Sequence, residues 1–278
     1  MKNVKTYLLL LFLAGCGDLE VDISPSDPLV VVEGWLIDVD TIQRVRLTHS
    51  QLFSDSETIN TIKDATIKVR TGNTFYDFTY VVDGWYHSNE KFKAKTRSFY
   101  QIQIALNSGD TIVSDPEFIR LAPTIDSLNF DFYERESPDN PNVIDVIYYP
   151  IATIKDDSTQ ENFYRWKVYR NDTLFNNPED LVLISDRFFN GNTTTFANEF
   201  TQFEFYYDDK ITLELLQITE LGYKYLRNIK SQTTTLGTES SVTPAPVYGN
   251  LSYLNSDQTV LGYWGITSFN RRSLKISE

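Results

Sequence analysis

Apolar and polar residues alternate in short segments over residues 29–121, and such alternation is typical of half-buried β-strands. Val45 and Leu47, for example, fall on the opposite face from Arg44 and Arg46. The spacing of these segments predicts an antiparallel sandwich of immunoglobulin or transthyretin type. Its strands are expected at residues 29–37, 44–48, 65–70, 74–82, 85–86, 99–106 and 111–114, with a loop at 51–64.

Prolines mark the end of this predicted domain. Pro116 and Pro123 each interrupt sheet pairing and stiffen the chain, because proline has no backbone N–H to donate. Residues 122–278 are therefore predicted to form a second β-rich domain. Its strands are expected at residues 129–133, 143–149, 163–170, 181–185, 203–207, 211–216 and about 260–266, separated by polar loops such as 134–142 and 171–180.

One helix is expected within this second domain, near residues 220–231. Thr219 is a suitable N-cap, and Leu221, Tyr225 and Ile229 recur at helical spacing. We expect the helix to pack on a sheet through these side chains. The residues after the closing strand carry no core-forming pattern. The whole chain is thus predicted to be mostly β, with one helix near the C-terminus.

The N-terminal segment is predicted to direct the chain to a membrane. The apolar run at residues 7–13 is far shorter than the roughly 20 residues that a spanning helix needs, and it follows Lys2 and Lys5, as in a secretory signal. Leu13-Ala14-Gly15-Cys16 is a lipobox. Residues 1–15 are therefore expected to be removed, with Cys16 acylated by diacylglycerol and a further chain such as palmitate. The alternative is an ordinary signal peptide with an incidental cysteine.

Residues 16–28 are expected to form a lipidated tether. Asp18, Glu20 and Asp22 make an acidic leader, and Pro25 and Pro28 favour an extended chain. Acidic residues after a lipidated cysteine resemble the surface-export signal of bacteroidetes-type lipoproteins, which predicts an outer-membrane protein at the cell surface. The alternative interpretation is a solvated spacer.

Net charge and cysteine content bear on the expected partners and on the expected crosslinks. The 278 residues have a formal charge of -13, and the loss of Lys2 and Lys5 with the signal makes it -15. Because nucleic acid phosphates would repel such a chain, nucleic acid is not an expected partner. Cys16 is the only cysteine, so no disulfide within the chain stabilises the fold.

No catalytic, cofactor-binding or metal-binding residue is assigned from the sequence. His49 and His87 are the two histidines, and each is interpreted as a strand or turn residue. No nucleophile elbow, P-loop or dinucleotide motif is present in the sequence. The pairs Asp38 with Asp40, Asp156-Asp157 and Asp208-Asp209 offer oxygens to calcium but lack the spacing of a calcium loop, and they are interpreted as solvated turn carboxylates. A carboxylate pair for sugar hydrolysis stays open, because only distance in space defines it.

Aromatic residues and short hydroxyl motifs offer candidate surface features. Most of the four tryptophans are expected in the core, the alternative being stacking platforms for sugars or partners. The tyrosines near turns are candidates for an interface. Exposed Asp-Ser/Thr triplets, such as those at Ser158 and Thr173, resemble an O-glycosylation motif. The tryptophans are Trp35, Trp85, Trp166 and Trp264, and the tyrosines are Tyr148, Tyr149, Tyr206, Tyr207 and Tyr248.

The order of several short motifs resembles one known family. These motifs are Val30-Val31-Val32-Glu33-Gly34-Trp35, Ile125-Asp126-Ser127-Leu128, a helix with Tyr223 and Tyr225, Pro246-Val247-Tyr248-Gly249-Asn250-Leu251 and Leu261-Gly262-Tyr263-Trp264. With the lipobox, their order is similar to the domain of unknown function 4249 lipoproteins over nearly all of the mature chain. The resemblance implies an outer-membrane lipoprotein often encoded beside a TonB-dependent receptor. It implies no established activity and no catalytic residues.

Three functions follow from these observations. The first is a non-enzymatic accessory subunit of a TonB-dependent uptake system, with the receptor or another outer-membrane protein as partner. The second is a structural subunit of a surface assembly, secretion or adhesion complex. The third, and least supported, is a hydrolase whose carboxylates are brought together only by the fold. The ligand is not predicted.

Overall fold

The computed structural model describes residues 27–51, 59–234, 247 and 249–277. The lipobox, Cys16, most of the predicted tether and Tyr248 lie outside these residues. Within the described part of the chain, no helix is both long and apolar enough to cross a membrane.

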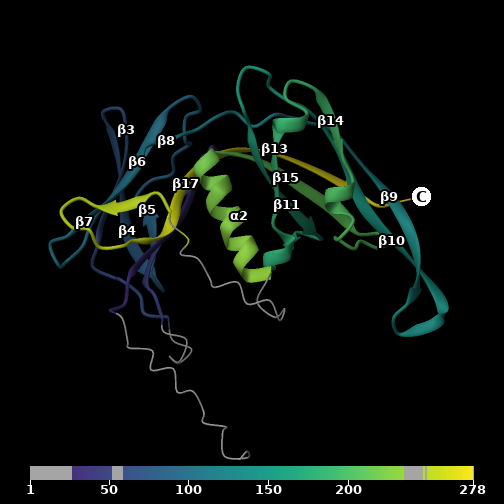
Figure 1. The fold of residues 1–278 in the computed structure, drawn as a ribbon, viewed down its shortest axis with the longest axis horizontal. Helices are drawn as coiled ribbons and strands as arrows, with labels where there is room; N and C mark the ends of the chain where they lie inside the picture. Colours follow the sequence, from purple (N-terminus) through teal and green to yellow (C-terminus); the bar gives the residue numbers. More distant parts are fainter. Residues whose placement is uncertain (1–26, 52–58, 235–246, 248, 278) are drawn as a thin grey trace, which may run out of the picture.

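The predicted class is confirmed, because 54% of the described residues are strand and 10% are helix. The described residues form a 14-stranded sheet, a three-stranded sheet and one α-helix near the C-terminus, joined by loops and turns (Figure 1). The large sheet follows the order β12-β11-β15-β17-β1-β2-β5-β4-β3-β6-β7-β16, with β13 on β11 and β8 on β6. The small sheet has the order β14-β10-β9.

The first half of the chain forms a sandwich-like lobe from the predicted strands. Asp83 and Gly84 both have positive φ, 48° and 81°, as a tight hairpin turn between two strands requires. The strands are β1 (Val30–Ile37), β2 (Arg44–His49), β3 (Thr66–Thr71), β4 (Thr74–Val82), β5 (Trp85–Ser88), β6 (Phe99–Ala105), β7 (Thr111–Ser114) and β8 (Glu117–Phe118).

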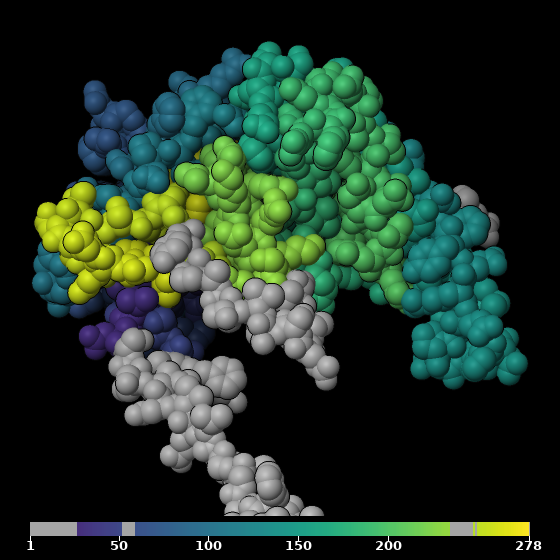
Figure 2. Space-filling model, in the orientation of Figure 1, coloured from purple at the N-terminus to yellow at the C-terminus, as the bar shows by residue number. Residues whose placement is uncertain are grey.

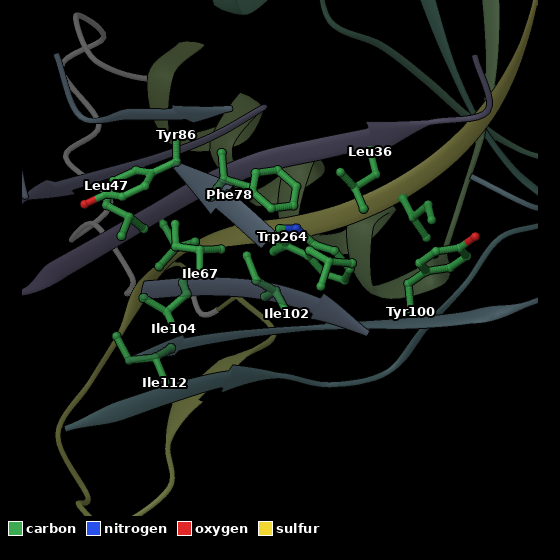
Figure 3. Packing of buried hydrophobic residues seen from close by; sticks show 14 of the residues in the cluster. Leu36, Leu47, Ile67, Phe78, Tyr86, Tyr100, Ile102, Ile104, Ile112 and Trp264 are labelled. Atoms are coloured by element: carbon green, nitrogen blue, oxygen red, sulfur yellow. The ribbon is translucent and has the colours of Figure 1, made fainter. Parts of the chain in front are cut away.

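Side chains from opposite parts of this curled sheet meet in the first hydrophobic core. Leu36, Leu47 and Tyr86 project toward Ile102 and other side chains of the facing strands (Figure 3). All four are at most 1% exposed. The core therefore comes from the inward positions of the alternating strands, as the sequence pattern predicts.

The C-terminal strands return to this first lobe. Strand β16 (Leu251–Tyr253) pairs with β7, and β17 (Leu261–Lys275) runs parallel to β1 along residues 261–267. From residue 268 onward β17 instead pairs antiparallel with β15. One strand therefore belongs to both halves, although the prolines near residue 121 separate the halves in the sequence.

The second half of the chain surrounds a core of its own. Buried Trp166 contacts Phe196 and Phe200 there, with ring centroids 5.5 and 5.4 Å away. The strands are β9 (Ile125–Ser137), β10 (Asn140–Lys155), β11 (Phe163–Arg170), β12 (Thr173–Leu174), β13 (Val182–Ser185), β14 (Thr193–Phe196) and β15 (Lys210–Ile218), and short 3-10 turns lie at Pro178–Asp180, Asp186–Phe188 and Asn198–Phe200.

Two element predictions in this half were wrong. Residues 134–142 were expected to be a loop, but all except the two turn residues belong to strands β9 and β10. Main-chain hydrogen bonds pair these strands, and such pairing needs no apolar pattern. The strand expected at 203–207 is absent, and only Phe205 forms an isolated bridge, to Tyr148. Phe203 and Phe205 are both fully buried in the second core, but Tyr207, the next position of the predicted alternation, is 58% exposed.

Helix α2 (Glu220–Thr234) lies between the two lobes (Figure 1). Thr219 is its N-cap, as predicted, because the Gly222 N–H donates to Thr219 Oγ1 at 3.2 Å. The predicted packing face was wrong in one position: Leu221 is 49% exposed, and Leu226 is buried instead. The end of the chain also contributes to the core, contrary to the prediction, because Ile276 is 1% exposed.

Candidate interaction surface

The hairpin of β9 and β10 extends beyond the second lobe. The two strands pair from Ile125 and Ile154 at the base to Ser137 and Asn140 at the tip. The end of the hairpin stands away from the body of the molecule, in teal (Figures 1 and 2). We call residues 131–145, the outer part of this hairpin, the arm.

One face of the arm continues the core-facing side of the hairpin. Phe130 and Tyr148 pack against the second core, and the centroids of their rings are 5.5 Å apart. Phe132 stands opposite Tyr148 in the register, so its side chain lies on the same face, with the rings 5.9 Å apart. Phe132 is nevertheless 53% exposed and Ile144, further out, is 55% exposed. An apolar stripe therefore leaves the core and enters solvent.

The arm is strongly acidic around this stripe. It contains five acidic residues and one basic residue, Arg135. Arg135 donates to both carboxylate oxygens of Glu204, at 2.5 and 2.8 Å, so its charge is already neutralised. The acidic residues are Asp131, Glu134, Glu136, Asp139 and Asp145. A partner surface with basic side chains beside apolar ones would complement this arrangement.

Strand β9 is also an edge strand. It pairs with β10 on one side, and in the described part of the chain no strand pairs with its other edge. An unpaired edge presents N–H and C=O groups that can take up an extended segment of another protein. The arm thus combines an apolar stripe, a negative charge and an open edge.

A buried polar cluster fixes the helix and β17 to the first lobe. Glu117 Oε1 accepts from Tyr263 at 2.5 Å and from Asn250 at 3.0 Å, and Oε2 accepts from Thr219 at 2.8 Å. Glu117 is 2% exposed, and burial raises the pKa of its carboxyl, while the three hydrogen bonds act in the opposite direction. Because three segments distant in sequence meet at this carboxylate, the cluster is a structural junction.

Comparison with known protein families identifies the chain. Residues 17–273 match the family described as "Domain of unknown function (DUF4249)". The chain belongs to the DUF4249 family. No curated protein matches it. The resemblance seen in the sequence is thereby confirmed at the level of the family.

The DUF4249 motifs contribute to the junction between the halves. Trp35 from the first motif stacks on Tyr263 from the last, with centroids 5.3 Å apart, and Tyr225 of the helix stacks on Tyr263 at 5.1 Å. Asn250 accepts from the Trp264 N–H at 3.1 Å and donates to the Trp264 carbonyl at 2.7 Å. These motif residues therefore hold β17 in place and are not gathered around a ligand cleft.

The other candidate residues from the sequence are dispersed. Trp166 and Trp264 are buried in the two cores, whereas Trp35 and Trp85 are partly exposed. His49 and His87 lie on strands β2 and β5, as expected of strand residues. Cys16 lies outside the described residues, so its acylation stays a prediction.

The interpretation of the carboxylate pairs as solvated was wrong for two residues, because Asp156 is 4% and Asp209 is 7% exposed. Asp156 accepts from Tyr164 and from the Gly191 N–H, and Asp209 pairs with Arg170 at 2.7 Å. Among the described residues, no group of three or more His, Cys, Asp or Glu side chains is placed to hold a metal ion. Asp38 has a raised pKa because of burial.

Two of the candidate tyrosines and both candidate hydroxyls are exposed. Tyr207 is 58% exposed, and Tyr206, which is 37% exposed, lies under Arg170. Ser158 and Thr173 are both exposed, as the glycosylation hypothesis requires.

The arm itself was missed from the sequence, where residues 134–142 were interpreted as a loop. Three charged residues follow one another at Glu134, Arg135 and Glu136, so no apolar–polar alternation marked the outer part of this strand.

Proposed function

We propose that this DUF4249 protein is an outer-membrane lipoprotein, anchored at the cell surface through Cys16, and a non-enzymatic accessory subunit of a TonB-dependent uptake system. The lipobox and the acidic leader in the sequence support the location. Two or more acyl chains hold a protein on a bilayer durably, since each buried methylene contributes about 0.8 kcal/mol. The arm is proposed to contact the receptor.

The arm is the observation that carries this proposal. Other exposed apolar residues, such as Phe75 and Val81, lie on the sheet of the first lobe, where single exposed side chains are ordinary. Phe132 and Ile144 differ, because they continue the face that forms the second core along a hairpin that stands away from the body. A partner that covers this surface would remove apolar area from water, which would stabilise the complex.

A structural subunit of a surface assembly is the second candidate. The open edge of β9 favours it, because edge pairing can join several subunits into one sheet. A hydrolase has less support. Asp156 and Asp157 line a groove of about 630 Å³, but Asp156 accepts hydrogen bonds from Tyr164 and Gly191, and Asp157 accepts from Thr159.

A native pull-down tests the proposal. The tagged, lipidated protein would be isolated from detergent-solubilised outer membrane, and co-eluting proteins would be identified by mass spectrometry. A TonB-dependent receptor in stoichiometric amount is the expected result. Recovery with assembly or secretion subunits would favour the second candidate, and recovery of the protein alone would contradict both.

A further inference from the structure

A groove of about 630 Å³ lies at the junction of the two lobes. Its first wall comes from the first lobe, with Arg97, Phe118 and Arg120. The facing wall comes from the end of β10, with Lys155, and from the turn that follows it, with Gln160. The groove is separate from the arm, so an inference about it does not depend on the proposed function.

Backbone contacts fix both arginines at this groove. The Arg97 N–H donates to the Ile119 carbonyl at 2.8 Å, and the Ile119 N–H donates to Ser98 at 3.1 Å. Arg97 adopts a φ of 60°, an unusual value for a residue other than glycine. The carbonyl of Arg120 accepts from Ser268 Oγ at 2.6 Å, which ties it to β17. The two guanidinium groups are thus carried on well-defined backbone.

The groove contains cations without carboxylate partners. Within the described residues, Arg97, Arg120 and Lys155 form no salt bridge, although the chain as a whole carries a formal charge of -13. Lys155 Nζ donates to the Gly191 carbonyl at 2.6 Å, which leaves its charge uncompensated. Arg120 Nε is inaccessible and has no hydrogen-bond acceptor among the described residues. A ligand in the groove can therefore meet Arg120 only through its terminal guanidinium nitrogens, because Nε is not accessible from the groove.

The two aspartates of the groove are already engaged by other donors. Asp156 is 4% exposed and accepts from Tyr164 and from the Gly191 N–H. Asp157 accepts from the backbone and hydroxyl of Thr159, at 3.0 and 2.8 Å, and these bonds, with a smaller effect of Arg97, lower the pKa of its carboxyl. These donors are neutral, so the case for an anion depends on the excess of basic side chains: Arg97, Arg120 and Lys155 line the groove against the two aspartates.

We propose that this groove binds a small anionic ligand through an oxyanion, a carboxylate or a phosphate, held between Arg97 and Arg120. Guanidinium groups bind both oxyanions by paired, charge-assisted hydrogen bonds. Phe118 offers an apolar wall for the body of the ligand, and Gln160 a neutral donor. The adjoining hollow of about 280 Å³ carries Glu161 and Glu220, so the anion lies on the Arg97 side.

Calorimetric titration of the lipidated protein in detergent, with citrate and separately with inorganic phosphate, tests this proposal. Saturable binding of at least one is expected at physiological ionic strength. Binding of citrate alone identifies a carboxylate ligand, and binding of phosphate alone a phosphate ligand. Absence of saturable binding for both anions would overturn the proposal.

Two variants and a control locate the binding. Arg97→Asn, which tolerates positive φ, and Arg120→Gln should each weaken binding by about tenfold or more. Arg227→Gln, at an exposed position on α2, should leave it unchanged. Thermal unfolding confirms that each variant is folded, and Arg97 is exposed, so its replacement leaves the core intact. Unchanged affinity in folded Arg97→Asn would also overturn the proposal.

Discussion

Gly262 and Gly109 have nearly the same backbone conformation, with φ of 92° and 94°, but different surroundings. A Cβ at Gly262 would lie 2.0 Å from the Val32 carbonyl oxygen, whereas a Cβ at Gly109 has no heavy atom within 4 Å. The conformation alone requires glycine at both positions. At Gly262, the close approach of β17 to β1 is a second reason why only glycine fits.

We therefore predict that Gly262→Ala costs about 3 kcal/mol or more of unfolding free energy, against about 1 kcal/mol for Gly109→Ala. The first value combines backbone strain with displacement of β1, and the second contains the strain alone. Urea unfolding of the two variants measures the difference. Equal losses would contradict the close approach of Gly262 to the Val32 carbonyl oxygen.

Glu117 predicts a dependence of stability on pH. Because burial raises its folded-state pKa above the ordinary value of 4.5, the folded protein holds this proton at pH values where the unfolded chain has lost it. The contribution of Glu117 to stability is thus fully present below about pH 4.5 and is lost as the pH rises through the folded-state pKa. Gln at this position resembles the protonated acid and does not titrate.

Glu117→Gln should therefore become more stable relative to the wild type as the pH rises from about 5 to 8. Urea unfolding at both pH values measures this change. Glu199→Gln, at an exposed position, is the control and should show no such trend. An advantage of the wild type that grows with pH would show that the three hydrogen bonds to Glu117 outweigh its burial.

At the scale of elements, the helix shows how packing decides which side chains are buried. Helical spacing alone placed Leu221, Tyr225 and Ile229 on one face. In the structure, Leu226 is 8% exposed and packs with Phe163, whereas Leu221 points to solvent. The helix rests between β11 and the Trp35–Tyr263 stack, and this environment is not visible in the sequence of the helix.

We predict that Leu226→Ala costs about 2–5 kcal/mol of unfolding free energy, because it opens a cavity at a buried contact. Leu221→Ala, on the same helix, should cost less than about 0.5 kcal/mol. Chemical unfolding of both variants checks the pair. Similar values for the two would contradict the orientation of the helix.

Much of the β structure was predictable from the sequence, because alternation and turn residues are local signals. Strands β1, β3 and β15 lie close to their predicted positions. The hairpin of β9 and β10 was only partly predicted, since both faces of the arm are solvated and its charged residues resemble a loop. The parallel pairing of β17 with β1 joins residues far apart in sequence, which no local pattern indicates.

The candidate surfaces were predictable to a smaller extent. Cys16 depends on a contiguous motif and could be found from the sequence, although its acylation stays a prediction. The stripe of Phe132 and Ile144 exists only once the strand register places them on one face. The groove likewise depends on the fold, which brings Arg97 of one lobe close to residues near position 157 of the other.

At the scale of the whole molecule, one sheet joins both lobes. Strand β17 pairs with β1 in its first part and with β15 in its second, and α2 covers the junction. The arm projects from this continuous body (Figure 2). A projecting arm suits contact with a neighbouring protein, and the proposed function, in which the body is anchored to a membrane, has this contact as its central claim.

Comparison of two double variants in the native pull-down tests this claim most directly. Phe132→Ser with Ile144→Ser removes the apolar stripe, and Phe75→Ser with Val81→Ser replaces side chains of similar exposure on the first lobe. Covered hot-spot side chains commonly contribute at least about 2 kcal/mol each, so the arm variant should lose most of its receptor. The control should retain it. Equal recovery of the receptor with both variants would contradict a docking role for the arm.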